Sequence, residues 1–178
     1  MRKLILKIRR KYDKYLNRFR IWKLRLFGAK VGRGVRSYGK IILHGDPRKL
    51  TIGEGTELST HVLLNCKDRL TIGKGVQLSA FVQIHTASLD LTQPPPRKHV
   101  SEPVVIEDHV WLASSVVVSP GVTIGNNSCV AAGSIVVRDV KPGWLYGGVP
   151  AKPIKPLEAM AAEVKTSEES KNNPNPQS

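Results

Sequence analysis

A repeat of six residues is the feature of this sequence that most restricts its fold. From Ile106 onward the chain divides into consecutive blocks of six, and every block opens with Ile, Leu or Val. A strand repeats every two residues and an α-helix every 3.6, whereas a period of six is typical of a parallel β-helix. The sequence therefore predicts an all-β solenoid in which three blocks form one coil and the block openers point inward. The openers are Ile106, Leu112, Val118, Ile124, Val130 and Val136, and the fifth residues of the blocks, small or β-branched, are Val110, Val116, Val122, Ser128 and Ser134.

The same period reaches back toward the N-terminus. An Ile or Val followed by Gly or Glu begins a coil at five places, namely Val31, Ile52, Ile72, Ile106 and Ile124. Their separations are 21, 20, 34 and 18 residues, so the third interval exceeds one coil by about sixteen residues. We expect these residues to leave the solenoid as an extruded loop at about 85–104. Long loops in compact domains are usually functional.

Residues 1–27 carry most of the positive charge. The first 30 residues hold twelve Lys and Arg but one acid, Asp13, out of a formal net charge of +14 for the whole chain. Apolar residues recur here at steps of three and four, which predicts an amphipathic basic helix that stops near Gly28. The longest unbroken apolar run is Leu4–Leu6, too short for a membrane span or the core of a signal peptide. The apolar stripe consists of Ile5, Ile8, Tyr12, Tyr15, Phe19, Trp22 and Leu26.

Three functions remain open for this helix. Its stripe can pack on the rest of the protein or on sister subunits, with the charges in solvent. Alternatively, the aromatic and aliphatic side chains can enter an anionic membrane surface while Lys and Arg meet the head groups. Nucleic-acid binding is the least favoured, because no recognised DNA- or RNA-binding module accompanies the charge.

The remaining segments have simpler interpretations. Cys66 and Cys129 lack the spacing of metal ligands and are too few for a disulfide scaffold, so we expect small buried residues. In residues 156–178, Pro156 can open a short helix through Leu157, Met160 and Val164 that caps the solenoid. From Ser167 onward the composition predicts a disordered tail. The solenoid itself is assigned to residues 28–155.

Four segments together resemble the hexapeptide-repeat acyltransferases, and most of all the O-acetyltransferases of galactosides, maltose and exopolysaccharides. They are residues 103–112 (PVVIEDHVWL), 120–125 (PGVTIG), 132–136 (AGSIV) and 148–154 (GVPAKPI). The resemblance implies a left-handed parallel β-helix, a homotrimer, and acetyl-CoA as co-substrate in the cleft between subunits, with no metal. It implies acetyl transfer to a sugar hydroxyl in cell-surface polysaccharide synthesis. The acceptor would be a carbohydrate or lipid-linked saccharide, and the location the cytoplasm or the inner face of the cytoplasmic membrane.

Family members use a histidine near the start of the extruded loop as general base. Relatives place this histidine directly before an aspartate, but the corresponding position here is Leu89, followed by Asp90. His85, four residues earlier, is the best remaining candidate, and His99 in the same loop is a second. Alternatively, the chemistry has been lost and the protein is a membrane-associated scaffold or regulator of polysaccharide assembly.

The resemblance also transfers positions of the coenzyme A groove. Ser114 and Ala132, eighteen residues apart, match positions whose backbone contacts the pantetheine arm. Val137 and Arg138 stand where relatives commonly have Thr-Lys. Lys155 matches a basic residue near the nucleotide phosphates, with Lys152 close to it in sequence. Lys and Arg suit this role because they form charge-assisted hydrogen bonds with phosphate oxygens.

Overall fold

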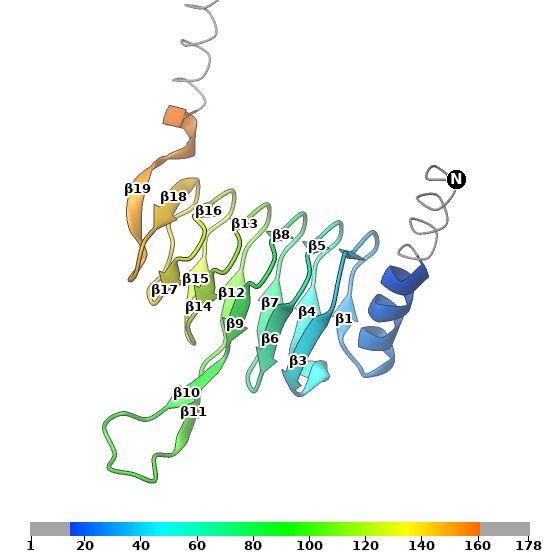
Figure 1. Ribbon diagram of the computed structural model, residues 1–178, viewed down its shortest axis with the longest axis horizontal. Helices are drawn as coiled ribbons and strands as arrows, with labels where there is room; N and C mark the ends of the chain where they lie inside the picture. The colour runs from blue at the N-terminus through cyan, green and yellow to red at the C-terminus, as the bar shows by residue number, and fades with distance from the viewer. Residues whose placement is uncertain (1–14, 161–178) are drawn as a thin grey trace, which may run out of the picture.

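A computed structural model describes residues 15–160, which form a parallel β-solenoid of five coils with an N-terminal helix against its first coil (Figure 1). The first sheet has the order β1 (Lys30–Val31), β4 (Leu50–Ile52), β7 (Leu70–Ile72), β12 (Val104–Ile106) and β15 (Thr123–Ile124). The second sheet has the order β2 (Arg36–Ser37), β5 (Glu57–Leu58), β8 (Gln77–Leu78), β13 (Trp111–Leu112), β16 (Cys129–Val130), β18 (Trp144–Gly147) and β19 (Lys152–Pro156). The third sheet has the order β3 (Ile41–Gly45), β6 (Val62–Cys66), β9 (Gln83–His85), β14 (Val117–Val118) and β17 (Ile135–Val136). A 3-10 turn, η1 (Pro47–Lys49), connects the first coil to the second.

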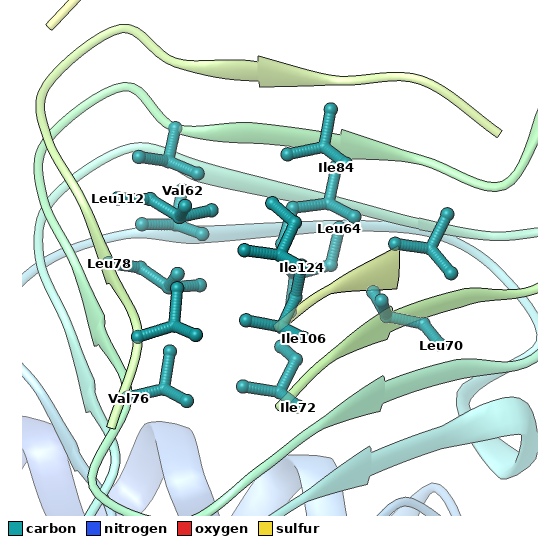
Figure 2. Close-up of a cluster of buried hydrophobic side chains, with 14 of the residues drawn as sticks. Val62, Leu64, Leu70, Ile72, Val76, Leu78, Ile84, Ile106, Leu112 and Ile124 are labelled. Carbon is teal, nitrogen blue, oxygen red and sulfur yellow. The ribbon is translucent and has the colours of Figure 1, made fainter. Parts of the chain in front are cut away.

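The five predicted coil starts form one column in the first sheet. The register pairs Val31 with Ile52, Ile52 with Ile72, Ile72 with Ile106, and Ile106 with Ile124. The last four of these side chains are at most 1% exposed, and three of them are labelled in the core shown in Figure 2. The period-six prediction of the fold is therefore confirmed.

Each of the other two sheets contributes an inward column of its own. The second sheet stacks Leu58, Leu78, Leu112 and Val130 in register. The third sheet stacks Leu64, Ile84, Val118 and Val136 in register. All eight side chains are at most 2% exposed. Figure 2 labels four of them, Leu64, Leu78, Ile84 and Leu112. Since each coil places one opener on each sheet, the core is a continuous stack of branched aliphatic side chains.

The extruded segment contains an antiparallel hairpin that the sequence did not predict. Its strands are β10 (Ala87–Leu89) and β11 (His99–Ser101), and the hairpin projects away from the solenoid wall between β9 and β12 (Figure 1). Both strands lie within the segment of about 85–104 that was expected to leave the coil. The extra residues keep their backbone hydrogen bonds by pairing with each other, which lets them leave the coil.

The helix of residues 15–26 buries a different face from the predicted stripe. Ile21 and Leu24 are 5% and 8% exposed and belong to the solenoid core. The stripe residues of this segment are instead exposed, Tyr15 by 71%, Phe19 by 47%, Trp22 by 53% and Leu26 by 62%. The expectation that the stripe packs on the rest of the chain is therefore wrong for these four residues. Ile21 and Leu24 are thus the side chains of this helix that are buried against the solenoid.

The two ends of the described chain follow the predictions in part. Gly28 has a φ of +96°, a left-handed conformation that ends the helix where the sequence predicted. At the other end, residues 157–160 are helical and begin one residue after Pro156, which closes β19. Residues 1–14, Val164 and the predicted tail from Ser167 lie outside the described residues. Both cysteines are free and buried as expected, and burial raises the pKa of the Cys66 thiol to about 12.

Candidate functional site

His85 lies at the root of the hairpin, on the outer face of the third sheet. The register places it beside Asn65, which in turn pairs with His44. Its Nε2 atom is 3.3 Å from Oε1 of Gln83, and the side chain is half-buried. Burial, followed by the nearby His44 imidazole, lowers the pKa of His85 from its ordinary value of 6.5. The imidazole is therefore neutral at neutral pH and able to accept a proton.

Thr86 fixes the point at which the hairpin leaves the wall. Its hydroxyl is fully buried, donates to the Asn65 carbonyl at 2.8 Å and accepts from the Asp68 amide at 2.9 Å. The Thr86 carbonyl also accepts from the Glu102 amide at 3.0 Å, which joins the outgoing and returning strands. The root of the hairpin is thus held rigidly against the neighbouring coil.

The hairpin brings His99 opposite Leu89. The antiparallel register pairs these two residues directly, and the Asp90 amide donates to the Lys98 carbonyl at 2.9 Å just beyond them. Directly paired residues of an antiparallel ladder project from the same face, with Cβ atoms about 5 Å apart. Both side chains are exposed. The His99 imidazole therefore lies close to Leu89, the position at which the related acyltransferases carry their histidine.

Ser114 and Ala132 occupy equivalent corners of successive coils. The Gly133 amide donates to the Ser114 carbonyl at 2.9 Å, and both Ser115 and Gly133 have left-handed φ angles, of 61° and 70°. This bond joins the corner at Ser114 to the corner at Ala132 in the next coil. Both residues are exposed, so the corner is open to an extended ligand.

A hollow of about 390 Å³ lies beside Ser114 on the second sheet. Tyr38, Glu57, Ser59 and Gln77 line it from the first three coils. Oε1 of Glu57 accepts from the Tyr38 hydroxyl at 3.2 Å and from Nη1 of Arg36 at 3.1 Å. Sequence reasoning missed Tyr38 and Glu57. The signal that could have found them is their coil position, since the residue directly before or after a buried strand residue faces outward.

The remaining groove positions gather at the C-terminal end of the solenoid. Val137 and Arg138 are exposed and follow β17 directly. Lys152 and Lys155 lie on β19, opposite Gly147 and Leu145 of β18. The Ala151 amide donates to the Ile135 carbonyl at 2.8 Å, which brings the start of β19 to the strand that precedes Arg138. The three cations predicted for the groove, Arg138, Lys152 and Lys155, thus lie in the last part of the solenoid.

One chain does not bring His85 and Ser114 together. Ser114 is at the corner between the second and third sheets, where the Ser115 amide donates to the Ala80 carbonyl. His85 lies at the far edge of the third sheet, five residues after Ala80, which corresponds to roughly 15 Å of extended chain. A hydroxyl activated at His85 would be too far from a ligand at Ser114 of the same chain. His99 lies farther out still, on the projecting hairpin (Figure 1).

Among residues 15–160, no three His, Cys, Asp or Glu side chains come together in a group able to hold a metal ion. In the same part of the chain, no helix has the length and apolar character needed to cross a bilayer.

Comparison with known proteins gives both short and long matches. The family described as Bacterial transferase hexapeptide (six repeats) matches residues 103–138. The galactoside O-acetyltransferase of Escherichia coli (strain K12) is 47% identical over 57 residues, which make up 32% of this chain and 28% of that protein. In this relative and three others with similarly short matches, the alignment spans 26–28% of the relative's length.

The longer matches cover most of the solenoid. A protein of Escherichia coli (strain K12) named for colanic acid biosynthesis, the acetyltransferase WcaF, is 36% identical over 149 residues, 79% of this chain and 76% of that protein. The crystal structure of a hexapeptide-repeat acetyltransferase of Vibrio cholerae O1 biovar eltor, in complex with acetyl coenzyme A, superposes with a TM-score of 0.69. It has 32% sequence identity and covers 75% of this chain and 74% of that one.

Proposed function

The chain belongs to the hexapeptide-repeat acyltransferase family, and we propose that it transfers an acetyl group from acetyl-CoA to a sugar hydroxyl in cell-surface polysaccharide synthesis. The observation that carries this proposal is the pair of stacked, exposed corners at Ser114 and Ala132, which lie beside a polar hollow. Arg138, Lys152 and Lys155 lie in the last part of the same solenoid. The similarity to a solenoid that binds acetyl coenzyme A supports the same donor. The similarity to a protein named for colanic acid biosynthesis supports a saccharide acceptor.

Different residues would bind different parts of coenzyme A and of the acceptor sugar. Arg138, Lys152 and Lys155 would hold the phosphates of coenzyme A by charge-assisted hydrogen bonds. Backbone groups at Ser114 and Ala132 would position the pantetheine arm. The hollow lined by Tyr38, Glu57 and Ser59 offers the hydroxyl and carboxylate groups that suit a sugar.

Acetyl transfer requires a general base that accepts the hydroxyl proton and a hydrogen-bond donor that stabilises the oxyanion. The acceptor hydroxyl gives its proton to a neutral imidazole as its oxygen bonds to the thioester carbonyl carbon. The carbon–sulfur bond then breaks, and the imidazolium returns the proton to the leaving thiolate. A backbone N–H of a coil corner stabilises the oxygen that becomes negative.

We assign the base to His99 before His85, and the cross-strand pairing with Leu89 supports this order. In this proposal His99 replaces the family histidine from the neighbouring strand, on a hairpin that projects away from the solenoid of its own chain. His85 keeps a lowered pKa but lies on the wall, roughly 15 Å along the chain from the coenzyme corner of its own subunit.

The test is thiol release from acetyl-CoA in the presence of galactosides, maltose and other sugars. His99→Ala is expected to lower the rate about 100-fold or more, and His85→Ala by much less. The matched control is His109→Asn, since His109 is exposed at a coil corner with a φ of 57°, which Asn tolerates. A larger loss of rate with His85→Ala than with His99→Ala would assign the base to His85. Acetyl-CoA binding by calorimetry without thiol release for any sugar would favour the non-catalytic scaffold.

The active unit is proposed to be a homotrimer, as is typical of the family. The support is that His99 and Ser114 of one chain do not meet, so the site is complete only when two copies share it.

We further propose that residues 1–27 hold the protein at the inner face of the cytoplasmic membrane. The support is the exposed stripe of Tyr15, Phe19, Trp22 and Leu26, which the solenoid leaves uncovered. Aromatic side chains flanked by Lys and Arg are the composition of helices that lie in a bilayer interface.

A further inference from the structure

Two grooves follow the N-terminal helix, one on each side. The first has a volume of about 600 Å³ and lies between the helix and the first coil. Its apolar lining comes from Phe19, Ile21, Trp22 and Val35, and its cations are Arg18 and Arg25. We call it the coil-side groove.

The second groove, the strand-side groove, has a volume of about 380 Å³. Leu24, Phe27 and Leu43 supply its apolar lining. Its cations are Arg20 and Lys23 of the helix together with Lys40, which belongs to the first coil. The two grooves thus share one chemistry, an apolar floor with cations at the rim.

The helix between the grooves is fixed in place. Oδ1 of Asn17 accepts from the Ser37 amide at 2.5 Å, and Arg25 donates to the carbonyls of Val31 and Gly32. Ile21 and Leu24 are buried beneath it. The grooves are therefore formed before any ligand arrives, which reduces the entropy lost on binding.

The charge around the grooves has one sign. Residues 15–36 contain seven Lys and Arg and no Asp or Glu. None of the three ion pairs formed within residues 15–160 uses a cation of either groove, since they join Arg33 to Glu54, Arg36 to Glu57 and Arg48 to Asp46. The natural occupant of each groove is an anion with an apolar part.

Charge also argues against two other occupants. A second copy of this chain would bring the same cations against themselves. Residues 1–14 contain seven Lys and Arg and one acid, so they would also be repelled from the rims.

We propose that each groove receives the phosphate head group of an anionic phospholipid, with the first methylenes of the lipid against the apolar floor. This inference rests on the membrane attachment proposed above. It adds that a cation outside the helix, Lys40, takes part, so recognition depends on the groove and not on the helix alone. Each basic residue near an anionic membrane contributes about a fivefold change in affinity.

The test measures binding of the full chain to vesicles by co-sedimentation. The vesicles contain either phosphatidylcholine alone or phosphatidylcholine with about one third phosphatidylglycerol. Lys40→Gln and Arg18→Gln are each expected to weaken binding to the anionic vesicles about fivefold. Lys30→Gln is the matched control, because Lys30 is an exposed lysine of the same end, on β1, and lines neither groove.

The outcomes separate the inference from the attachment itself. Weaker binding to anionic vesicles with Lys40→Gln, and unchanged binding with Lys30→Gln, would support lipid binding in the grooves. Lys40→Gln and Lys30→Gln could instead weaken vesicle binding equally, or Lys40→Gln could leave it unchanged. Either result would overturn lipid binding in the grooves but would leave membrane attachment through the apolar stripe intact. Equal binding to both kinds of vesicle would overturn recognition of the anionic head group. No vesicle binding, with concentration-dependent association beyond a trimer, would identify a second copy as the occupant and overturn both proposals.

Discussion

Leu89 and His99 face each other across the hairpin, and this pairing gives the protein an imidazole near a position from which the usual one is missing. The sequence separates the two residues by ten positions and suggests no contact between them. Residue spacing alone favours His85, which is nearer to Leu89 along the chain. The antiparallel register supports the proposed order, His99 before His85, because the hairpin and not the distance along the chain places side chains together.

The pKa of His85 gives a prediction that distinguishes the two histidines. Burial and then His44 lower this pKa below 6.5, so the folded state binds fewer protons at this site than the unfolded state as the pH falls through 6.5. The contribution of His85 to stability is therefore lost at low pH, between 6.5 and its lower folded pKa. We expect an imidazole NMR titration to give a value below 6.5, and His44→Gln to raise it.

The lowered pKa of His85 also predicts how the pH dependence of the reaction would differ between the two candidate bases. If His85 were the base, the acidic limb of kcat/KM would lie below pH 6.5 and would move upward in His44→Gln. If His44→Gln leaves the acidic limb of the kcat/KM profile unchanged, the result would support His99 as the base. An unshifted NMR titration of His85 in the wild-type protein would contradict the environment described for its ring.

At the scale of the element, the N-terminal helix has two apolar faces with different functions. Ile21→Ala is expected to destabilise the fold by about 2 kcal/mol or more, since the side chain is 5% exposed and packs on the solenoid. Phe19→Ser with Trp22→Ser should change stability little but should release the protein from anionic vesicles. Thermal unfolding and vesicle flotation measure the two effects separately.

The contrary results are equally specific. Destabilisation by the Phe19 and Trp22 substitutions would mean that the stripe is covered by protein in the assembled molecule. Deleting residues 1–27 would be a poorer experiment, because it would also remove Ile21 and Leu24 from the core.

At the scale of the whole molecule, the separation of His99 from Ser114 predicts that inactive chains can complement one another. His99→Ala lacks the proposed base, and Ser114→Trp should block the coenzyme corner. In trimers mixed at random from equal amounts of the two, about a quarter of the interfaces would join an intact His99 to an intact Ser114.

We therefore expect co-expressed variants to recover up to about a quarter of wild-type thiol release, whereas each variant alone stays inactive. The control is co-expression of His99→Ala with His99→Lys, which has no intact base and should recover nothing. Absence of recovery in mixed trimers of confirmed mass would mean that each site lies within one chain.

The sequence by itself determined the solenoid, the position of the extruded segment and the inward columns. This was possible because Ile52, Ile72, Ile106 and Ile124 recur at the coil period, and a periodic fold buries every residue that shares a phase. The structure alone decided which residue faces Leu89 and which face of the helix is buried. Neither follows from a period, because the first depends on the register of an irregular hairpin and the second on the shape of the open coil end. The candidate site combines both kinds of part. The corners at Ser114 and Ala132 follow from the period, whereas His99 could be named from the sequence but not placed opposite Leu89. Tyr38 and Glu57, which line the hollow, carried no motif that named them.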